Sequence, residues 1–246
     1  MGVALSFAGV HIGDTGLINS GILALRGSLT VFDKARDPVY WRKAKHFLGR
    51  ALVFLGGIEE EEINFLDQAV IALRESLVET PRLEAPREWQ NTMVDLGWAL
   101  QKLGERESDI NRLREAKGTF EEVLVDLTSK VSPIDWCSAT SGLGSTLRVL
   151  GELQNDTELL RQSITQFERS FDVISVTSNQ LRWAVTHLEI GKVYGVMSEL
   201  EFDDEYADRC RGECNKALEA FSGQAPVKIQ NDVDNVLARL DRAEAC

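Results

Sequence analysis

The sequence predicts an all-α protein built as a solenoid, in which antiparallel helix pairs stack one on the next. The first observation is a tryptophan followed eight residues later by a glycine, a pattern that occurs four times in the 246-residue chain. The tryptophans lie 48, 47 and 47 residues apart, and the pairs are Trp41 and Gly49, Trp89 and Gly97, Trp136 and Gly144, and Trp183 and Gly191. The second observation is that apolar residues in each unit recur at the 3.6-residue period of a helix, in two successive runs. A fixed period of this length indicates repeats that share one continuous core.

The first helix of each unit is expected to begin near a proline. Three of the four tryptophans follow a proline by three residues, at Pro38, Pro86 and Pro133. Proline is favoured in the first turn of a helix, where its missing N–H costs nothing. In the first complete unit we expect Gly56 and Gly57 to end this helix, because glycine adopts the left-handed cap conformation at little cost.

The second helix of each unit repeats a small, large, large order of side chains, one helical turn apart. The four sets are Ala69, Leu73 and Leu77; Ala116, Phe120 and Leu124; Ser163, Phe167 and Phe171; and Cys210, Cys214 and Leu218. A small side chain allows one end of the helix to approach its neighbour closely. Because the tryptophan-to-glycine spacing is constant, we expect Gly97 and Gly144 to lie where two helices touch, with no room for a side chain.

The repeat phase also describes the two ends of the chain. The units cover residues 1–37, 38–85, 86–132, 133–179, 180–225 and 226–246. The first unit is partial, with room for only a stub of a first helix, and the last is a single capping helix whose charged residues suit a solvated face. The N-terminal end has no such polar cap, since Val3, Leu5, Phe7, Val10 and Ile12 lie close together. We therefore expect this end to continue a longer array or to pair with something, such as a second copy of the chain.

These units resemble tetratricopeptide repeats, helix-turn-helix units of about 34 residues with an ordered Trp, Leu-Gly, Tyr, Ala, Phe and Pro pattern. Leu96–Gly97 stands for the Leu-Gly pair, Tyr194 for the tyrosine, Ala116 and Phe120 for the alanine and phenylalanine, and Pro81 for the proline. The resemblance covers residues 15–243 and is closest to the long-repeat bacterial variant, because the tryptophan lies one turn early and the repeat is about 13 residues longer. It implies a right-handed superhelix with the first helices along a concave groove. A period of about 47 residues also suits HEAT or armadillo repeats, although the Leu-Gly pair with its downstream alanine and phenylalanine favours the tetratricopeptide reading.

Charge and composition argue against several classes of function. The formal net charge of −12 is unfavourable for a general nucleic-acid or membrane-surface binder, since such proteins need a cationic surface. No apolar run approaches the ~20 residues that span a bilayer. The four cysteines, Cys137, Cys210, Cys214 and Cys246, are too unevenly spaced for a disulfide framework, which indicates free thiols in a reducing compartment. We therefore expect a cytoplasmic protein that contacts neither nucleic acid nor membrane.

We expect no catalytic, cofactor or metal site. The three histidines fall in no nucleophile motif. Cys210 and Cys214, one helical turn apart, could form half of a metal site, but no second pair has ligand spacing and both fall at core positions of the repeat. Acidic runs such as Glu59–Glu62 lie at the turns between paired helices and lack the spacing and glycine of an EF-hand. Acids there complement the dipole of the following helix, so the chain is not expected to be an enzyme.

The candidate binding surface is the face of the first helices opposite the core. Its twenty positions hold five Lys or Arg and no Asp or Glu, in a chain of 27 bases and 39 acids, although so few positions can also lack acids by chance. The candidate partner-binding residues are Lys43, His46, Arg50, Phe54, Asn91, Trp98, Lys102, Arg148 and Lys192. We expect a locally positive groove, suited to an acidic segment or a C-terminal carboxylate with an apolar side chain. The carboxylate-binding residues typical of the resembled family do not recur at matching positions.

Two functions remain open from the sequence. The first is a non-enzymatic scaffold that binds a peptide or helix of another protein, such as an acidic one, in its concave groove. The second is a regulatory or oligomerisation segment of a larger signalling protein or enzyme. The acid-free face favours the first function, and the uncapped apolar N-terminal end favours the second.

Overall fold

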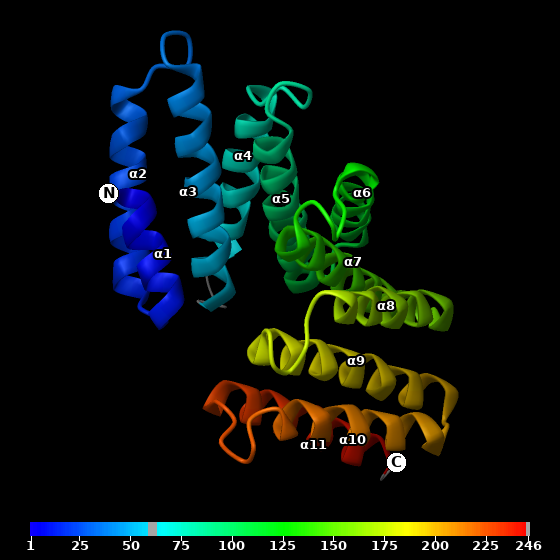
Figure 1. Cartoon of the computed structure of the whole chain (residues 1–246). Helices are drawn as coiled ribbons and strands as arrows, with labels where there is room; N and C mark the ends of the chain where they lie inside the picture. Colours follow the sequence, from blue (N-terminus) through cyan, green and yellow to red (C-terminus); the bar gives the residue numbers. More distant parts are fainter. Residues whose placement is uncertain (59–62, 245–246) are drawn as a thin grey trace. The chain divides into compact units, whose positions relative to one another are not determined.

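The computed structural model describes residues 1–58 and 63–244. In these ranges the chain forms helices joined by turns and loops, with no strand (Figure 1). The chain forms two compact units, Met1–Asp126 and Leu127–Cys246. Within each unit, helices pack mainly against their neighbours in the sequence, as expected of an all-α repeat. No helix in the described ranges combines the length and the apolar character needed to cross a membrane. The acidic run Glu59–Glu62 lies outside the described residues.

The first unit consists of three helix pairs in the described ranges. These are α1 (Gly2–Ile12) with α2 (Thr15–Val31), α3 (Pro38–Ile58) with α4 (Ile63–Val78), and α5 (Pro86–Glu107) with α6 (Ile110–Asp126). The second helix of one pair packs on the first helix of the next, as α2 does on α3 and α4 on α5. The first helices also contact one another, α1 with α3 and α3 with α5, and so form one layer. The core between the helices includes Ile18, Leu25, Leu52, Leu73 and Leu100, all buried.

The second unit repeats this arrangement and ends in a single helix. Its elements are α7 (Pro133–Gln154), α8 (Thr157–Arg169), the short 3-10 helix η1 (Ser170–Asp172), α9 (Gln180–Glu201), α10 (Asp204–Glu219) and α11 (Val227–Glu244). The last helix, α11, packs against both α9 and α10 and buries Ile229, Val233 and Leu240. The predicted terminal first-type helix is thus present, with its charged residues Asp234 and Asp241 exposed.

The glycines of the repeat lie where paired helices touch. A Cβ atom added at Gly97 would be 2.6 Å from Cε1 of Phe120, and one added at Gly144 would be 3.1 Å from Cδ1 of Phe167. The equivalent contacts in the other complete pairs are Gly49 with Leu73 and Gly191 with Cys214. The expected close approach at Gly97 and Gly144 is therefore present, and the residue facing each glycine is the middle member of the small, large, large set.

The expectation that Gly56 and Gly57 end the first helix is wrong. Helix α3 continues through both glycines to Ile58. A Cβ atom at Gly56 would lie 2.9 Å from the side chain of Leu66, so this glycine also serves close helix packing. The residues that take the left-handed backbone conformation after α5, α7 and α9 are Ser108, Asn155 and Phe202, and none of them is a glycine.

The tryptophans and cysteines contribute to the core. Trp89 and Trp136 are buried, with 8% and 6% of their surface exposed, whereas Trp41 and Trp183 are partly buried. Cys210 and Cys214 are fully buried in the apolar cluster between α9, α10 and α11. The prediction that this cysteine pair packs in the core is therefore confirmed.

The N-cap of α8 gives a first testable prediction. One carboxylate oxygen of Asp156, Oδ1, accepts hydrogen bonds from the backbone N–H groups of Glu158 at 2.9 Å and Leu159 at 3.2 Å. Asp156→Ala is expected to lower the free energy of unfolding by about 1 kcal/mol, because both donors lose their acceptor. Urea unfolding followed by circular dichroism measures the change. Asp208→Ala, at an exposed position within α10, is the control and should change stability by less than about 0.5 kcal/mol. Equal losses in the two variants would contradict the capping role.

Candidate functional site

A polar pocket in the first unit gathers several of the predicted groove residues. Lys43, His46 and Arg50 are spaced three and four residues apart on α3, so they share one face of that helix. Asn91 joins them from the adjacent first helix, α5. Together with Glu88 these side chains line a pocket of about 120 Å³. The sequence therefore identified a set of residues that the fold brings together.

Arg50 lines this pocket from α3. Its guanidinium carbon lies 4.8 Å from the ring centre of Phe7 and 5.9 Å from that of Phe54. Its Nε atom is buried and makes no hydrogen bond within the described part of the chain. No carboxylate among the described side chains forms an ion pair with it. Arg50 thus offers a planar, pre-oriented cation whose hydrogen-bonding capacity is not fully used.

A small apolar hollow adjoins the polar pocket, and Arg50 belongs to both. The hollow has a volume of about 10 Å³ and is lined by Val3, Phe7, Val10, Phe47, Arg50 and Phe54. Phe7 from α1 meets Phe47 from α3 edge to face, with ring centres 6.3 Å apart. Phe7 and Phe54 keep 43% and 38% of their surface exposed. A cation and two exposed aromatic rings are therefore adjacent on the layer of first helices.

His46 connects α3 to α5 beneath the pocket. Its Nδ1 lies 2.7 Å from Oγ1 of Thr92, whose own proton is donated to the Glu88 carbonyl, so Nδ1 is the donor to Thr92. Its Nε2 lies 3.5 Å from a carboxylate oxygen of Asp95. Burial lowers the pKa of His46 to about 4, and the neighbouring Arg50 charge acts in the same direction, whereas Glu88 opposes them. His46 is therefore neutral at physiological pH and adds no positive charge to the pocket.

The positive charge of Lys43 is offset in part by Glu88. Its Nζ lies 3.1 Å from Oε1 of Glu88, and Nη2 of Arg42 lies 2.9 Å from the other carboxylate oxygen. Desolvation raises the pKa of Glu88, but hydrogen bonds from Lys43 and Arg42 outweigh it and hold the pKa below its usual range. Glu88 is therefore ionised, but its single negative charge is shared by Lys43 and Arg42. Among the described residues that line this pocket, the cations Arg42, Lys43 and Arg50 outnumber this one carboxylate.

The remaining predicted residues of the first unit lie further along α5. Trp98 is partly buried and meets Phe120 edge to face, with ring centres 5.9 Å apart. The Nζ atom of Lys102 lies 6.0 Å from the Trp98 ring centre. These two residues are near each other but do not line the pocket around Arg50.

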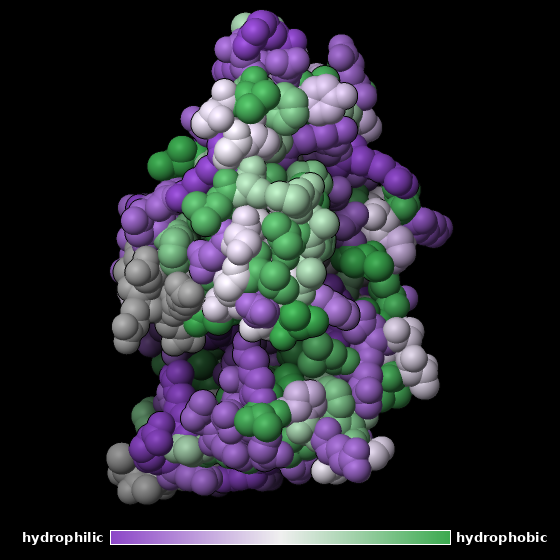
Figure 2. Space-filling view, turned by 90° about the vertical axis from the view of Figure 1, so that its left-hand side faces the viewer, coloured by the Kyte–Doolittle hydropathy of each residue, from purple (hydrophilic) through white to green (hydrophobic). Residues whose placement is uncertain are grey.

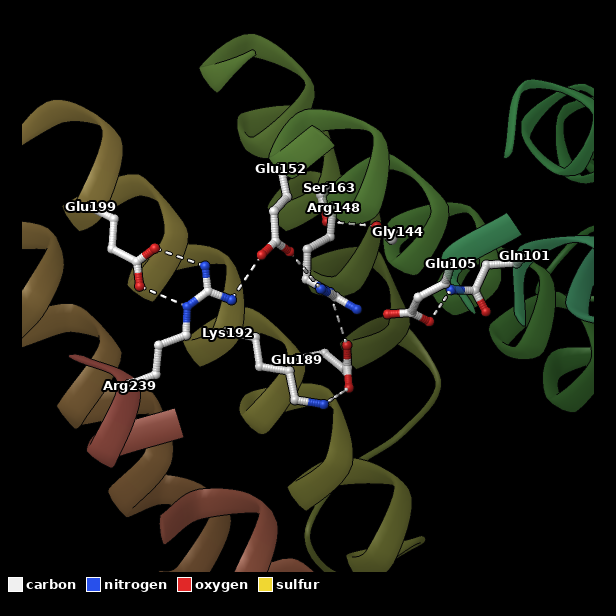
Figure 3. Close-up of polar contacts among 10 residues, drawn as sticks. All are labelled: Gln101, Glu105, Gly144, Arg148, Glu152, Ser163, Glu189, Lys192, Glu199 and Arg239. Atoms are coloured by element: carbon white, nitrogen blue, oxygen red, sulfur yellow. Dashed lines mark hydrogen bonds and ion pairs between the residues drawn. The ribbon is translucent and has the colours of Figure 1, made fainter. Parts of the chain in front are cut away.

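Arg148 and Lys192 lie together in the second unit, beside a cavity of about 310 Å³ that both of them line. Arg148 on α7 pairs with Glu152 at 3.3 Å and with Glu189 at 3.5 Å, and Lys192 on α9 pairs with Glu189 at 2.6 Å (Figure 3). The expected positive groove is therefore not present at these two residues, because each cation has a carboxylate partner. The cavity carries charges of both signs.

Arg239 extends this network to the last helix. It holds Glu199 on α9 through two hydrogen bonds of 2.7 Å and Glu152 on α7 through one of 2.8 Å (Figure 3). The hydrogen bonds with Glu199 come first among the causes that raise the pKa of Arg239. Arg239 thereby joins α11 to α7 and α9, a role that the sequence did not indicate beyond its place on the capping helix.

The acidic partners of these cations lie outside the five positions on each helix that are opposite the core, so the acid-free pattern did not indicate them. Glu152 stands four residues after Arg148, and Glu189 stands three residues before Lys192. Both spacings bring side chains together on one helix face, so a search that included flanking positions would have found these pairs. Glu88 lies 45 residues from Lys43, and no local spacing could have found that contact.

In the described ranges, no group of three or more His, Cys, Asp or Glu side chains is arranged to hold a metal ion. When compared with models of known protein families and with curated proteins, the chain matches none of them. The function is therefore argued from the geometry around Arg50 and from the arrangement of the helices.

Proposed function

We propose that the protein is a non-enzymatic interaction scaffold. The layer of first helices in its first unit binds a peptide or helix of another protein that places an acidic group beside an apolar side chain. The observation that carries this proposal is Arg50, which lines both a polar pocket and an apolar hollow and forms no ion pair with a carboxylate among the described side chains. The resemblance to tetratricopeptide repeats supports it, because first helices line the binding groove in that family. A right-handed superhelix and a cytoplasmic location belong to the same proposal.

The chemistry of the site favours a carboxylate as the charged group. A guanidinium binds a carboxylate through two parallel hydrogen bonds, which fixes orientation as well as affinity. The guanidinium of Arg50 already lies near the rings of Phe7 and Phe54, so little side-chain freedom is lost on binding. The exposed parts of the same rings offer contact to an apolar side chain next to the carboxylate. Asn91 on the pocket wall can add a hydrogen bond to the ligand backbone.

The rest of the surface supports selectivity for this pocket. The chain has a net charge of −12, which repels an acidic segment from most of its surface. A pocket in which the described cations outnumber the carboxylates then attracts the segment locally, and this gives specificity and a faster association. Binding should weaken as salt rises, because partly exposed charges are screened over ~8–10 Å at physiological ionic strength.

A display screen tests this proposal. The intact chain is immobilised and a library of random short peptides is selected on it, and selected peptides are expected to carry Asp or Glu next to a large apolar residue. Arg50→Glu should weaken the binding of a selected peptide by at least about tenfold, since losing a charge-assisted hydrogen bond costs about 1.5–3 kcal/mol. Affinity is measured by fluorescence anisotropy with the labelled peptide.

Arg114→Glu is the matched control for this test. Arg114 is an exposed arginine on α6, a second helix of the same unit, so its reversal changes the net charge equally without touching the pocket. The control should change peptide affinity by less than about threefold at physiological salt. Selected peptides without acidic residues, or equal binding to wild type and Arg50→Glu, would overturn the proposal.

The alternative function, a regulatory or oligomerisation segment of a larger signalling protein or enzyme, draws on a different feature. Large apolar side chains are exposed on the first helix pair, including Ile12 at 66%, Leu23 at 67% and Val31 at 68%. Such a surface favours association with another protein chain. The two functions use different surfaces and are compatible in one molecule.

A further inference from the structure

The second unit contains a cavity that shares no residue with the pocket around Arg50. Its volume of about 310 Å³ lies at the lower end of the roughly 300–1,000 Å³ of small-molecule pockets. Its wall comes from three first-type helices, and includes Lys192 and Gly195 of α9 and Asp232 and Asn235 of α11. The cavity is therefore a feature of this unit by itself.

A glycine opens this cavity. In the repeat register, Gly195 takes the place of Val53, Gln101 and Arg148 in the three preceding complete units. A Cβ atom added at Gly195 would meet one atom within 4 Å, Sγ of Cys210 at 3.6 Å, which is an ordinary van der Waals contact. Close helix packing therefore does not require a glycine here, in contrast to the glycines that touch the paired helix. The missing side chain instead leaves space in front of α11.

The cations at this cavity already have carboxylate partners. Arg148 pairs with Glu152 and Glu189, and Lys192 pairs with Glu189 (Figure 3). The third cation, on α11, holds a carboxylate on α7 and another on α9 (Figure 3). Three described cations are thus matched by three carboxylates, which are Glu152, Glu189 and Glu199. An anionic ligand would have to compete with these carboxylates for the same donors, so the network does not favour one.

Asp232 adds a fourth carboxylate, for which this network supplies no cation. Its side chain is partly buried on the cavity wall and makes no hydrogen bond or ion pair with the described residues. Asn235 follows three residues later on the same face of α11, and its side-chain carbonyl is a second acceptor. Apolar side chains from α9 and α11 also line the cavity, including Val196 and Leu240. The complementary group is therefore a cation with N–H donors and a short hydrocarbon chain.

The surface of α9, α10 and α11 does not suggest a docked helix as the occupant. These helices lie at the lower end of Figure 2, where the surface that they show is mainly hydrophilic and apolar residues stand singly. A helix that docks in a groove needs a continuous apolar stripe to receive it. This side of the three helices does not present such a stripe, and a small ligand needs only the cavity.

We propose that this cavity binds a small aliphatic ammonium ion, which is either a free amine or the side chain of a lysine on a peptide. The ammonium group donates hydrogen bonds to Asp232 and Asn235, and the hydrocarbon chain lies against Val196 and Leu240. A hydrogen bond between two charged groups is about twice as strong as one between neutral groups. The net charge of −12 also raises the concentration of cations near the protein.

An NMR titration of the intact chain with two amines tests this proposal. The probes are n-butylamine as a free amine and N-acetyl-lysine methylamide, which presents the same chain and ammonium group as a peptide does. We expect binding with a dissociation constant of about 1 mM or below, seen as shifts of the amide signals of α9 and α11. Tighter binding of n-butylamine assigns the site to free amines, and tighter binding of the blocked lysine assigns it to a peptide. Binding should weaken as salt rises, because the charges are partly exposed.

Two variants of the cavity and one matched control follow from the geometry. Asp232→Asn removes the charge and keeps the shape of the side chain, so the affinity should fall by at least about tenfold. Gly195→Leu should also abolish binding, because its side chain occupies the cavity. Asp234→Asn is the control, since it makes the same change of charge at an exposed position of α11 and keeps an oxygen for the hydrogen bond from Gln230. It should change the affinity by less than about threefold.

The proposal is overturned if neither amine shifts the signals of α9 and α11 at concentrations up to about 10 mM. Equal affinity of wild type and Asp232→Asn for n-butylamine would also overturn it. So would acetate binding at the same residues in preference to either amine, because the cations of the network would then be the ligand-binding groups. If Gly195→Leu loses helix by circular dichroism, Asp232→Asn decides the test alone, because its side chain is not part of the core.

Discussion

Gly97→Leu is expected to lower the free energy of unfolding by about 3 kcal/mol, at the upper end of the usual range for an overpacked core. The reason is the contact between α5 and α6, where even a Cβ atom would lie 2.6 Å from a ring carbon of Phe120. Phe120 is fully buried, so its ring has no open space into which it can move. Thermal unfolding followed by circular dichroism should show a melting temperature lower by roughly 6–12 °C for a chain of this size.

The same substitution at Gly118 separates packing from helix propensity. Gly118 lies in α6, and a Cβ atom there meets nothing within 4 Å. Gly118→Leu is expected to raise stability by about 0.5–1 kcal/mol, because leucine is the better helix former. Combining Gly97→Leu with Phe120→Ala should recover part of the loss, since the smaller side chain makes room across the contact. If Gly97→Leu is as stable as wild type, the two helices do not touch at this glycine.

Acid is expected to destabilise the first unit through His46. Its pKa is lowered from 6.5 to about 4 in the folded chain, first by burial and then by the charge of Arg50. Between these two values the unfolded chain binds a proton that the folded chain does not, so stability is full above about pH 6.5 and decreases toward pH 4. A difference of this size corresponds to about 3 kcal/mol. Below about pH 4 both states are protonated and His46 causes no further change.

His46→Gln isolates this contribution from the other titrating groups. Glutamine keeps an N–H donor for Thr92 but does not titrate, so the variant should lose about 3 kcal/mol less than wild type between pH 7 and pH 4. Urea unfolding at pH 7, 5.5 and 4 measures the two curves. At pH 7 the free energy of unfolding of the variant differs from that of wild type only by the cost of the changed packing. Parallel curves for wild type and His46→Gln would mean that His46 is protonated equally in the folded and unfolded chains.

The binding surface was predictable only in part. Lys43, His46 and Arg50 were placed on one face because helix geometry fixes the direction of side chains three and four residues apart. Asn91 was placed beside them by the repeat phase, and the structure confirms that the four line one pocket. The expected positive character was reduced because Lys43, Arg148 and Lys192 have carboxylate partners. Which cation remains uncompensated depends on distances between side chains, and a pattern along one helix does not contain them.

The sequence by itself determined the helix pairs, their register and the close contacts at Gly97 and Gly144. The physical reason is that each of these is a local property that recurs at a fixed spacing: apolar periodicity selects the helix face, and a glycine in constant phase marks where no side chain fits. Tertiary structure alone decided that Gly56, within α3, packs against Leu66 of α4, and that the guanidinium of Arg50 lies near the rings of Phe7 and Phe54. These features arise where side chains of different helices meet, and their energies depend on which atoms come within contact distance.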